Sequence, residues 1–475
     1  MALNEEYIRQ IITETIKRLD LGDGGSAAAL QFVPSNRNGW LFDDPNDAIA
    51  AAKAAQEILK KETLEKRGAL IAAMRNAALE NAKYLAALAH EDTGYGSVVQ
   101  KIAKNQLAAI KTPGIEDLHP VAFSGDLGLT LVEMAPYGVI GAITPSTNPT
   151  ATVINNSISM IAAGNAVVFN PHPVAKRASQ EAIRILNEAV VSAGGPTGLM
   201  TTPKEPTLDS GKFIMEHPDI MLLVVTGGEA VVSVAMKSGK KCIAAGPGNP
   251  PVIVDETAEI IRSAKDIVDG ASYDNNVLCV SEKEVFAVDA VFDRLTNEML
   301  GQGCFKVTGE DINKIVAAVF TQKDGIYMVN RKYVGRDATY ILDESGVSYI
   351  GKPRLVIAEV DKNHPFVQIE MLMPVLGMVR VYSFDEALEE AFKAEHGNRH
   401  SAIIHSTNIH NMSRAAEKMD TTIFVKNGPS YSGLGFNGEG HATLTIATPT
   451  GEGLTSAKSF TRSRRCVVHG DFRIV

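Results

Sequence analysis

The feature that most constrains this chain is an alternation of short apolar runs and amphipathic segments over residues 139–270. The apolar runs, rich in Val and Ile, predict strands, and the amphipathic segments predict helices. A regular order of strand and helix is typical of an open, mostly parallel sheet with helices on both faces. The predicted strands are residues 139–144, 166–170, 220–226, 242–245 and 252–255, and the predicted helices are 150–163, 175–193 and 256–270.

Three turns follow predicted strands of this sheet, at the edge where such sheets bind ligands. Each turn can present backbone N–H groups and a helix N-terminus to a phosphate. Any strand-to-helix turn contains such residues, so one turn alone is weak evidence for a nucleotide site. The turns are Thr144-Pro-Ser-Thr-Asn148-Pro, Asn170-Pro-His172-Pro and Thr226-Gly-Gly228-Glu.

A fourth segment, Gly433-Leu-Gly435-Phe-Asn-Gly438, also fits a dinucleotide-binding pattern. That pattern requires a following helix whose N-terminus receives the pyrophosphate. The stretch from Glu439 to Thr450 is rich in Thr, Gly and Pro. We therefore predict a loop there.

The remaining body of the chain predicts helices before the sheet and a second α/β unit after it. The helices are expected from Asp44-Pro45 to about Lys61, over 62–89 and over 97–111, and the second unit from Glu284 to about Val425.

Two peripheral segments favour interfaces. Alternating Leu, Thr and Val from Leu127 to Val132 predict a hairpin strand that could serve an oligomer interface. The basic stretch from Ser456 to His469 is expected to be an extended segment, either solvated or at an interface.

The N-terminus combines an amphipathic helix pattern over residues 3–19 with a Gly- and Ser-rich linker over 22–29. A helix on a flexible linker can dock on the body of the protein or bind a partner. The pattern alone leaves both readings open.

Charge and cysteine usage exclude several classes of function. Lys and Arg number 46 against 55 Asp and Glu, a net charge of −9, which disfavours nucleic acid and anionic membranes as partners. The four cysteines are widely spaced, so we expect free thiols, a reducing compartment and no bound metal. We find no apolar run long enough to span a bilayer and expect a cytoplasmic protein.

Cys279 lies in the polar segment Tyr273-Asp-Asn-Asn-Val-Leu-Cys-Val-Ser-Glu-Lys283. A lone cysteine is structural more often than it is a nucleophile. The segment is nevertheless a place where a thiolate could form. Because the negative charge of Asp274 would by itself raise the pKa of the thiol, the Asp-Asn-Asn flank is better interpreted as loop geometry.

Several windows, in order along nearly the whole chain, resemble the aldehyde dehydrogenase superfamily, and more closely its CoA-acylating branch associated with bacterial microcompartments. The resemblance implies an α/β fold with two Rossmann-like domains and a β oligomerisation arm. The matching windows are 143–150, 224–229, 245–251, 274–283, 370–375, 424–429 and 448–453.

Carried over by these windows, the resemblance implies that Cys279 is the nucleophile. It implies that the side chain of Asn148, with the backbone N–H of Cys279, forms an oxyanion hole. An attacking thiolate creates such an oxyanion, and the product after hydride loss is a thioester. The positions it implies for NAD are Thr144, Pro145, Ser146, Asn170, Thr226, Gly227, Gly228 and, on the nicotinamide-side ribose, Glu370.

Two departures from the hydrolytic members of the family are informative. Where those enzymes carry a glutamate general base, this chain has Ala244, which cannot activate water. The thioester is therefore expected to wait for the thiol of coenzyme A, a better nucleophile. Asn170-Pro-His-Pro replaces a Lys-Pro-Ser-Glu segment that holds the adenosine ribose, which leaves NADP open as an alternative to NAD.

The expected activity is reversible, CoA-dependent oxidation of propanal or acetaldehyde with NAD. Two alternatives remain: a hydrolytic enzyme in which Glu282 replaces the lost base, and a catalytically silent structural relative. We expect a homo-oligomer, dimer or tetramer. The N-terminal helix resembles the encapsulation peptides of microcompartment cargo, which implies a shell protein as partner.

The expected domains are a targeting helix (1–19), a linker (20–30), a nucleotide-binding domain (31–122 and 136–270), a catalytic domain (271–440) and an oligomerisation arm (123–135 and 441–475).

Overall fold

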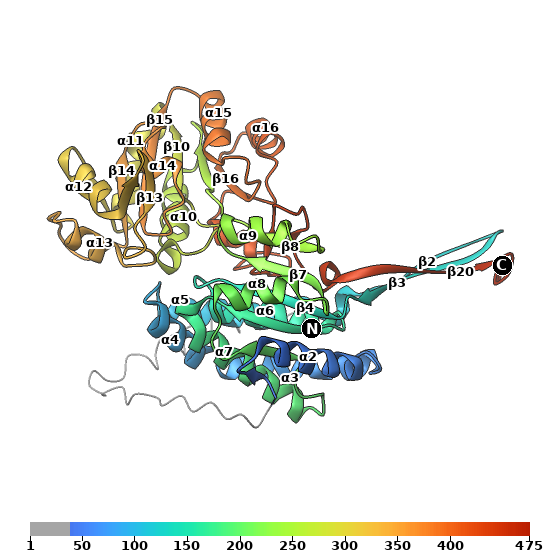
Figure 1. The fold of residues 1–475 in the computed structure, drawn as a ribbon. Coiled ribbons are helices and arrows are strands. Elements are labelled where there is room, and N and C mark those ends of the chain that lie inside the picture. The colour runs from blue at the N-terminus through green and yellow to red at the C-terminus, as the bar shows by residue number, and fades with distance from the viewer. Residues whose placement is uncertain (1–38) are drawn as a thin grey trace. The chain divides into compact units, whose positions relative to one another are not determined.

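The computed structural model describes residues 39–475. The helix expected over residues 3–19 and the linker after it lie outside the described residues. The described chain, from β1 to β20, belongs to one compact unit (Figure 1).

The first sheet has six parallel strands in the order β1-β6-β5-β4-β7-β8. Four of its strands were predicted as strands. The other two are short, and β6 reads Met-Thr-Thr-Pro, which has neither an apolar run nor clear alternation. The strands are β1 (Leu41–Phe42), β4 (Val139–Thr144), β5 (Ala166–Pro171), β6 (Met200–Pro203), β7 (Ile220–Thr226) and β8 (Cys242–Ala245).

Helices α2, α5, α6 and α7 match the predicted segments, residues 62–89 divide into two helices at Asn81, and α8 and α9 were not predicted. Asp44 caps α2 as expected, since its side chain accepts a hydrogen bond from Asn46 N at 2.8 Å. The helices are α2 (Pro45–Leu59), α3 (Leu64–Glu80), α4 (Ala82–Thr93), α5 (Val98–Lys111), α6 (Pro149–Ala162), α7 (Lys176–Ser192), α8 (Leu208–Glu216) and α9 (Glu229–Met236).

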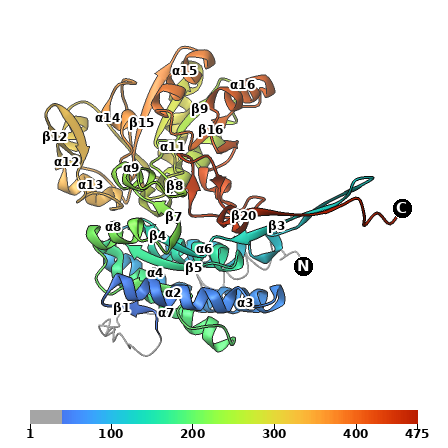
Figure 2. The ribbon, with the colours of Figure 1, turned by 45° about the vertical axis from the view of Figure 1, so that its right-hand side comes forward.

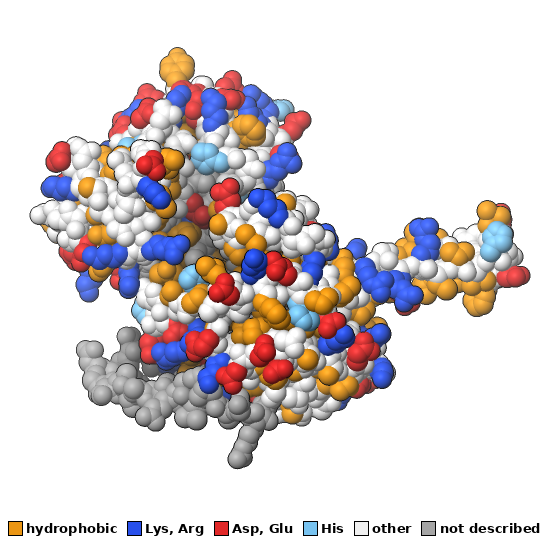
Figure 3. All heavy atoms as spheres, viewed as in Figure 1, with side chains coloured by type: hydrophobic (Ala, Val, Ile, Leu, Met, Phe, Trp, Pro, Cys, Tyr) orange, Lys and Arg blue, Asp and Glu red, His pale blue; other side chains and the backbone are white. Residues whose placement is uncertain are grey.

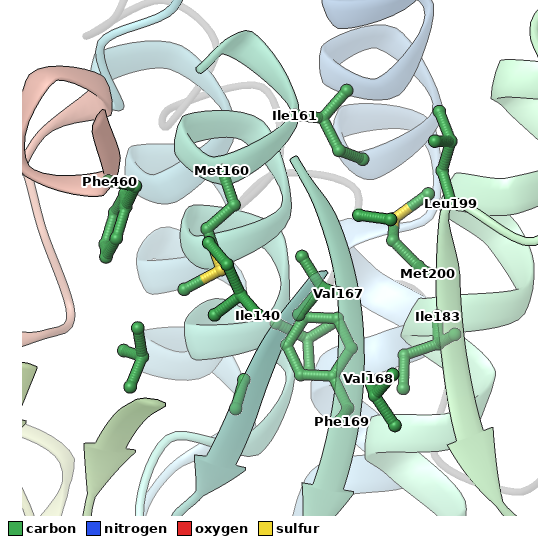
Figure 4. Packing of buried hydrophobic residues seen from close by; sticks show 14 of the residues in the cluster. Ile140, Met160, Ile161, Val167, Val168, Phe169, Ile183, Leu199, Met200 and Phe460 are labelled. Carbon is green, nitrogen blue, oxygen red and sulfur yellow. The ribbon is translucent and has the colours of Figure 1, made fainter. Parts of the chain in front are cut away.

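Helix α6 is buried along its whole length and anchors the core of this half. Met160 and Ile161 pack over Ile140 of β4 and the buried run of β5 (Figure 4). Phe460, more than 290 positions further along the chain, packs into the same cluster. The C-terminal segment therefore helps to fix the helix that begins at Asn148.

The second sheet has seven parallel strands in the order β11-β14-β15-β10-β9-β16-β17 (Figure 2). Its strands are β9 (Pro251–Val254), β10 (Glu284–Val288), β11 (Cys304–Val307), β14 (Leu355–Glu359), β15 (Val375–Val381), β16 (Ser401–His405) and β17 (Ile423–Lys426). Its helices are α10 (Ile260–Ser272), α11 (Asp289–Gly301), α12 (Glu310–Val319), α13 (Ala338–Glu344), α14 (Pro365–Gln368), α15 (Phe384–Ala394) and α16 (Ile409–Met419), and a hairpin joins β12 (Phe320–Lys323) to β13 (Ile326–Val329).

Strand β9 pairs with β10 and β16, so it belongs to the second sheet. Sheet membership therefore separates the two α/β units between β8 and β9, near residues 246–250, whereas the sequence suggested a boundary at 270. An apolar strand has the same sequence pattern in either sheet, because only its pairing partners determine the sheet to which it belongs.

A narrow three-stranded antiparallel arm projects from the body (Figure 1). It consists of β2 (Val121–Gly125), β3 (Gly128–Pro136) and β20 (Thr461–His469), so the hairpin and the basic strand predicted from sequence pair with each other. Residues 441–460 were expected in the arm but pack on the body, where they include β18 (Ile446–Ala447), β19 (Gly453–Leu454) and the buried Phe460.

Within residues 39–475, no helix is both long enough and apolar enough to cross a membrane. No group of three His, Cys, Asp or Glu side chains suited to a metal ion occurs in the same residues. All four cysteines are free thiols.

Candidate active site

The turn that carries Cys279 begins with three consecutive residues in the left-handed region. Asp274, Asn275 and Asn276 have φ of 49°, 53° and 65°. Asp and Asn adopt this conformation at lower cost than other non-glycine residues. The polar sequence before the cysteine is therefore what lets the chain turn sharply between α10 and β10.

Buried side chains hold this turn on both sides. The amide Nδ2 of Asn276 donates to the carbonyl oxygens of Ala271 at 2.8 Å and Glu282 at 2.9 Å. The ammonium of Lys283 donates to the carbonyl oxygens of Asn276 and Leu278, each at 3.0 Å. The backbone around Cys279 is consequently fixed by hydrogen bonds from inside the protein.

Cys279 is a half-buried residue at the end of this turn. Burial, and then the carboxylate of Glu370, raises the pKa of Cys279 to about 12. Lys283 and the backbone N–H groups of Cys279 and Val280 act in the opposite direction. The thiol is therefore protonated at neutral pH in this state, and its proton must be removed before attack.

Glu370 lies close enough to Cys279 and Lys283 for its charge to affect both of their pKa values. Burial raises the pKa of Glu370 to about 7, although Lys283 and a hydrogen bond from the backbone N–H of Gly248 lower it. The structure thus places this residue, predicted to hold the nicotinamide-side ribose, beside the nucleophile.

Replacing Glu370 with glutamine should make Cys279 a stronger nucleophile in the protein without NAD. Removal of the carboxylate takes away a charge that raises the pKa of the thiol. Alkylation by iodoacetamide should therefore be faster than in the wild type. The gain should grow above pH 7, where Glu370 is ionised. The matched control is Glu417→Gln, exposed on α16, and an unchanged alkylation profile in Glu370→Gln would contradict the placement.

Asn148 occupies the N-cap position of α6, and its carbonyl oxygen accepts from Thr152 N at 3.0 Å. An asparagine there normally caps the helix with its side chain. Here the side chain makes no cap bond. Its Oδ1 accepts from the ammonium of Lys104 at 2.5 Å, and its Nδ2 donates to Thr147 Oγ1 at 3.3 Å. One N–H of the carboxamide remains available to a ligand.

The structure connects Asn148 to the cysteine turn through Lys104. The same ammonium that donates to Asn148 also donates to the carboxylate of Asp274. A charge on Cys279 raises the pKa of Lys104, so the two groups are near each other. The two residues expected to perform the chemistry are thus joined by a third that the sequence did not indicate.

The expected nucleotide turns lie at the carboxyl ends of β4, β5 and β7. The chain runs outward from β4 through β5 to β6 and returns on the other side of β4 as β7, which makes the edge between β4 and β7 a topological switch point. Thr144 lies there with a buried hydroxyl that has no hydrogen-bond partner. Pro145 and Ser146 follow, half-buried.

The turn after β7 fits the approach of a phosphate. Gly228 is the N-cap of α9, and a side chain at that position would project into open space. Gly227 donates its N–H to Ala245 O at 3.3 Å, and the hydroxyl of Thr226 lies 3.2 Å from that of Thr445. Together with the unpartnered hydroxyl of Thr144, these residues suit a dinucleotide.

Asn170 is less available than the sequence suggested. Its Oδ1 accepts from Ser210 Oγ at 2.7 Å, and its Nδ2 donates to Thr207 O at 3.1 Å. Both partners belong to the start of α8. In this state the side chain of Asn170 therefore connects β5 to α8.

Glu282 is fully buried, and both of its carboxylate oxygens are occupied. Oε1 accepts from Ser430 N at 2.8 Å and Oε2 from Ser430 Oγ at 2.7 Å. Burial raises its pKa to about 7. A carboxylate held in this way fastens the chain around Ser430 and is poorly suited to activate water. Ala244 is fully buried in β8.

The sequence did not single out His400, which also lies beside Cys279. A side chain on Gly248 would sit 2.8 Å from His400 Cγ and 2.9 Å from Cys279 O, so the imidazole and the cysteine turn flank this glycine. Burial lowers the pKa of His400 to about 4, and its Nε2 has no partner. The imidazole is therefore neutral at neutral pH, and the same burial makes it a weaker proton acceptor than an exposed histidine.

The chain matches the model of the aldehyde dehydrogenase family over residues 42–443. It is 49% identical over 487 residues, spanning all of both chains, to an acetylating acetaldehyde dehydrogenase of Bilophila wadsworthia.

Two solved structures are also similar. A propionaldehyde dehydrogenase from the fucose utilisation microcompartment of Clostridium phytofermentans is 50% identical, with a TM-score of 0.90 over 92% of this chain and 100% of that one. A Rhodopseudomonas palustris propionaldehyde dehydrogenase with bound CoA and an acylated cysteine is 45% identical, with a TM-score of 0.89 over 91% of this chain and 98% of that one.

Proposed function

This chain belongs to the aldehyde dehydrogenase family and is a CoA-acylating aldehyde dehydrogenase, and we propose that Cys279 carries the acyl group as a thioester. The observation that carries the proposal is the site around Cys279. The half-buried Cys279 lies on a turn held by buried side chains. The uncapped carboxamide of Asn148 is linked to that turn through Lys104.

In the proposed reaction, the Cys279 thiol loses its proton and its sulfur attacks the aldehyde carbonyl carbon, so that a C–S bond and an oxyanion form. Asn148 Nδ2 and the backbone N–H of Cys279 donate to this oxyanion. Donors of this kind stabilise a transition state by about 3 to 4 kcal/mol each. When bound, NAD supplies the acceptor for the hydride of the former aldehyde carbon.

Loss of the hydride leaves an acyl thioester on Cys279. The sulfur of CoA then attacks the thioester carbonyl, acyl-CoA leaves, and the thiol of Cys279 is restored. This exchange of one thioester for another is reversible. The burial of Ala244 and the occupied carboxylate of Glu282 support transfer to CoA over hydrolysis.

The decisive assay measures NADH and acyl product with and without CoA. We expect acyl-CoA and steady NADH formation only when CoA is present, because Ala244 stands where hydrolytic relatives carry the general base and the carboxylate of Glu282 is occupied by Ser430. Carboxylate formed at full rate without CoA would favour the hydrolytic reading. No NADH under any condition would favour the silent structural relative.

We propose acetaldehyde or propanal as the substrate and NAD over NADP. Tyr273, Tyr431 and Phe436 form an aromatic cluster next to the cysteine turn, with ring centroids 5.1 to 6.0 Å apart. Aromatic rings next to the nucleophile favour an apolar aliphatic substrate. An aldehyde series from two to eight carbons, with each nucleotide, should give its highest kcat/KM at two or three carbons with NAD.

We propose that the arm joins copies of this chain into a homo-oligomer. Both β2 and β20 are edge strands, and they expose Val121, Phe123, Val467 and Val468. Figure 3 shows hydrophobic side chains along the arm. Unpaired edges with exposed apolar side chains favour association.

The double variant Phe123→Asp, Val467→Asp should lower the molar mass measured by light scattering toward that of one chain. Two charges on the exposed faces oppose burial against a second copy. Tyr382→Asp, which alters a residue 89% exposed away from the arm, is the control and should keep the parental mass. A double variant of unchanged mass would exclude the arm as the interface.

We propose that residues 1–19 direct the protein to a microcompartment shell, in line with the amphipathic pattern of that segment and the origin of the Clostridium phytofermentans relative. Deleting them should abolish co-purification with shell proteins while specific activity stays within about twofold, because the site lies in the described body. Loss of activity or solubility would mean that the segment docks on the body.

A further inference from the structure

Two lysines and one aspartate form a buried cluster next to the cysteine turn. The side chains of Lys101 and Lys104 are each 3% exposed, and that of Asp274 is fully buried. Asp274 Oδ2 accepts from both ammonium groups, from Lys101 at 3.1 Å, and Oδ1 accepts from Ser97 N at 2.7 Å. One lysine is enough to balance the carboxylate. The second buried positive charge therefore needs another explanation.

Only one of the two lysines reaches the proposed oxyanion hole. Lys104 donates to Asn148 Oδ1 at 2.5 Å, whereas the hydrogen bond of Lys101 goes to Asp274. Burial lowers the pKa of Lys104 to about 8, with Asp274 acting in the opposite direction. Lys104 is therefore an ammonium at neutral pH. An ammonium donates hydrogen bonds and accepts none.

This chemistry determines which way the carboxamide of Asn148 faces. The atom next to Lys104 must be the carbonyl oxygen, so Nδ2 must lie on the opposite side. Without Lys104, the Oδ1 of an N-cap asparagine is drawn to the free N–H groups of its own helix. A carboxamide turned toward those N–H groups would no longer hold its own N–H toward the oxyanion.

We propose that Lys104 is a positioning residue that holds the carboxamide of Asn148 with its N–H toward the oxyanion formed on Cys279. The inference rests on the proposed role of Asn148. Asp274 holds Lys104 and lies on the turn that carries Cys279. One buried cluster thus fixes both the donor and the nucleophile, and the charge of Lys104 also polarises the amide toward stronger donation.

The chain offers a matched pair of variants, Lys104→Met and Lys101→Met. Each keeps an unbranched side chain and leaves one lysine to pair with Asp274, so the two should melt within a few degrees of each other. Lys104→Met should lower the rate of the first NADH turnover about 10- to 100-fold, with little change in the KM for aldehyde. Lys101→Met should lower it less than about threefold.

A double-mutant cycle separates this role from a general effect on the site. In an Asn148→Ala background, Lys104→Met should lower the rate of the first turnover less than about threefold, because the carboxamide that Lys104 positions is already absent. Iodoacetamide alkylation of Cys279 uses no oxyanion hole. The ammonium of Lys104 also favours the thiolate of Cys279, so Lys104→Met should slow alkylation, but by a much smaller factor than it slows the first NADH turnover. Lys104→Arg keeps the hydrogen-bond donors and the charge, so it should retain more activity than Lys104→Met. It replaces Lys104→Met in these measurements if that variant does not fold.

The outcomes distinguish the inference from the function on which it rests. If Asn148→Ala leaves the first turnover unchanged, the proposed oxyanion hole is wrong. If Asn148→Ala is slow, three results would overturn the inference alone: multiplicative effects in the cycle, equal losses in the two methionine variants, or a loss in Lys104→Met matched by slower alkylation.

Discussion

Replacing Cys279 with alanine should lower aldehyde oxidation by about 10⁴-fold or more, while the melting temperature changes little. No other described side chain is placed to hold the acyl group, so the loss should approach that seen when a covalent nucleophile is removed. Cys279 is half-buried at the end of its turn, and alanine is smaller than cysteine. The variant should therefore fold normally, and NADH formation with saturating aldehyde, NAD and CoA is the measurement.

Cys304→Ala is the matched control, because Cys304 is a buried thiol on β11, the edge strand of the second sheet. Burial also raises its pKa to about 12. A high thiol pKa therefore does not by itself mark the nucleophile, and this control should keep near-parental activity. Mass spectrometry of the parent with aldehyde and NAD but no CoA should find the acyl mass on the peptide containing Cys279. An acyl group elsewhere would contradict the assignment.

Five strands of the two sheets, β4, β5, β7, β8 and β9, could be predicted because their apolar runs are continuous and separated by clear turns. The sheet to which β9 belongs could not be predicted, since its pairing with β10 and β16 depends on long-range contacts. The packing of residues 441–460 on the body could not be predicted for the same reason, since it also depends on long-range contacts. A sequence pattern reports burial, but it does not report the partner.

In the site, too, residues within sequence motifs could be predicted, whereas residues that only the fold brings together could not. The windows that carry the family resemblance singled out Cys279, Asn148 and the glycines before α9 as candidates. Lys104 and His400 were missed, because a lysine in a helix is usually solvated and a lone histidine is usually structural. One local signal was available: Lys101 and Lys104 share the buried face of α5 with Ile102 and Ala108.

Glu282 illustrates a residue whose type suggests chemistry while its surroundings suggest structure. The sequence allowed it as a substitute base. Its two hydrogen bonds from Ser430 and its contact with Gly270, where any side chain would collide with the carboxylate, show a packed structural role. The absence of a carboxylate at Ala244 therefore remains the stronger guide to CoA as acceptor.

Replacing Asn148 with alanine should lower the rate of the first NADH turnover by about 10²- to 10³-fold, the usual cost of removing one oxyanion donor. The KM for aldehyde should change far less, because the oxyanion exists only after attack. The loss of helix stability should be small, since the side chain of Asn148 makes no cap bond. Stopped-flow absorbance of NADH and thermal melting measure the two effects separately.

Asn408→Ala provides the opposite case at the same kind of position. Asn408 is the N-cap of α16, and its Oδ1 accepts from His410 N at 3.0 Å and Asn411 N at 3.3 Å. Its removal should cost about 1 kcal/mol of stability and leave the turnover rate near that of the parent. We expect Asn148→Ala to have a slow first turnover and an unchanged melting temperature, and Asn408→Ala to have a normal turnover and a lower melting temperature. This pair of results would distinguish a donor to the substrate from a helix cap. If Asn148→Ala instead kept a normal turnover rate and lost stability, the side chain of Asn148 would be a helix cap. The oxyanion would then need another donor.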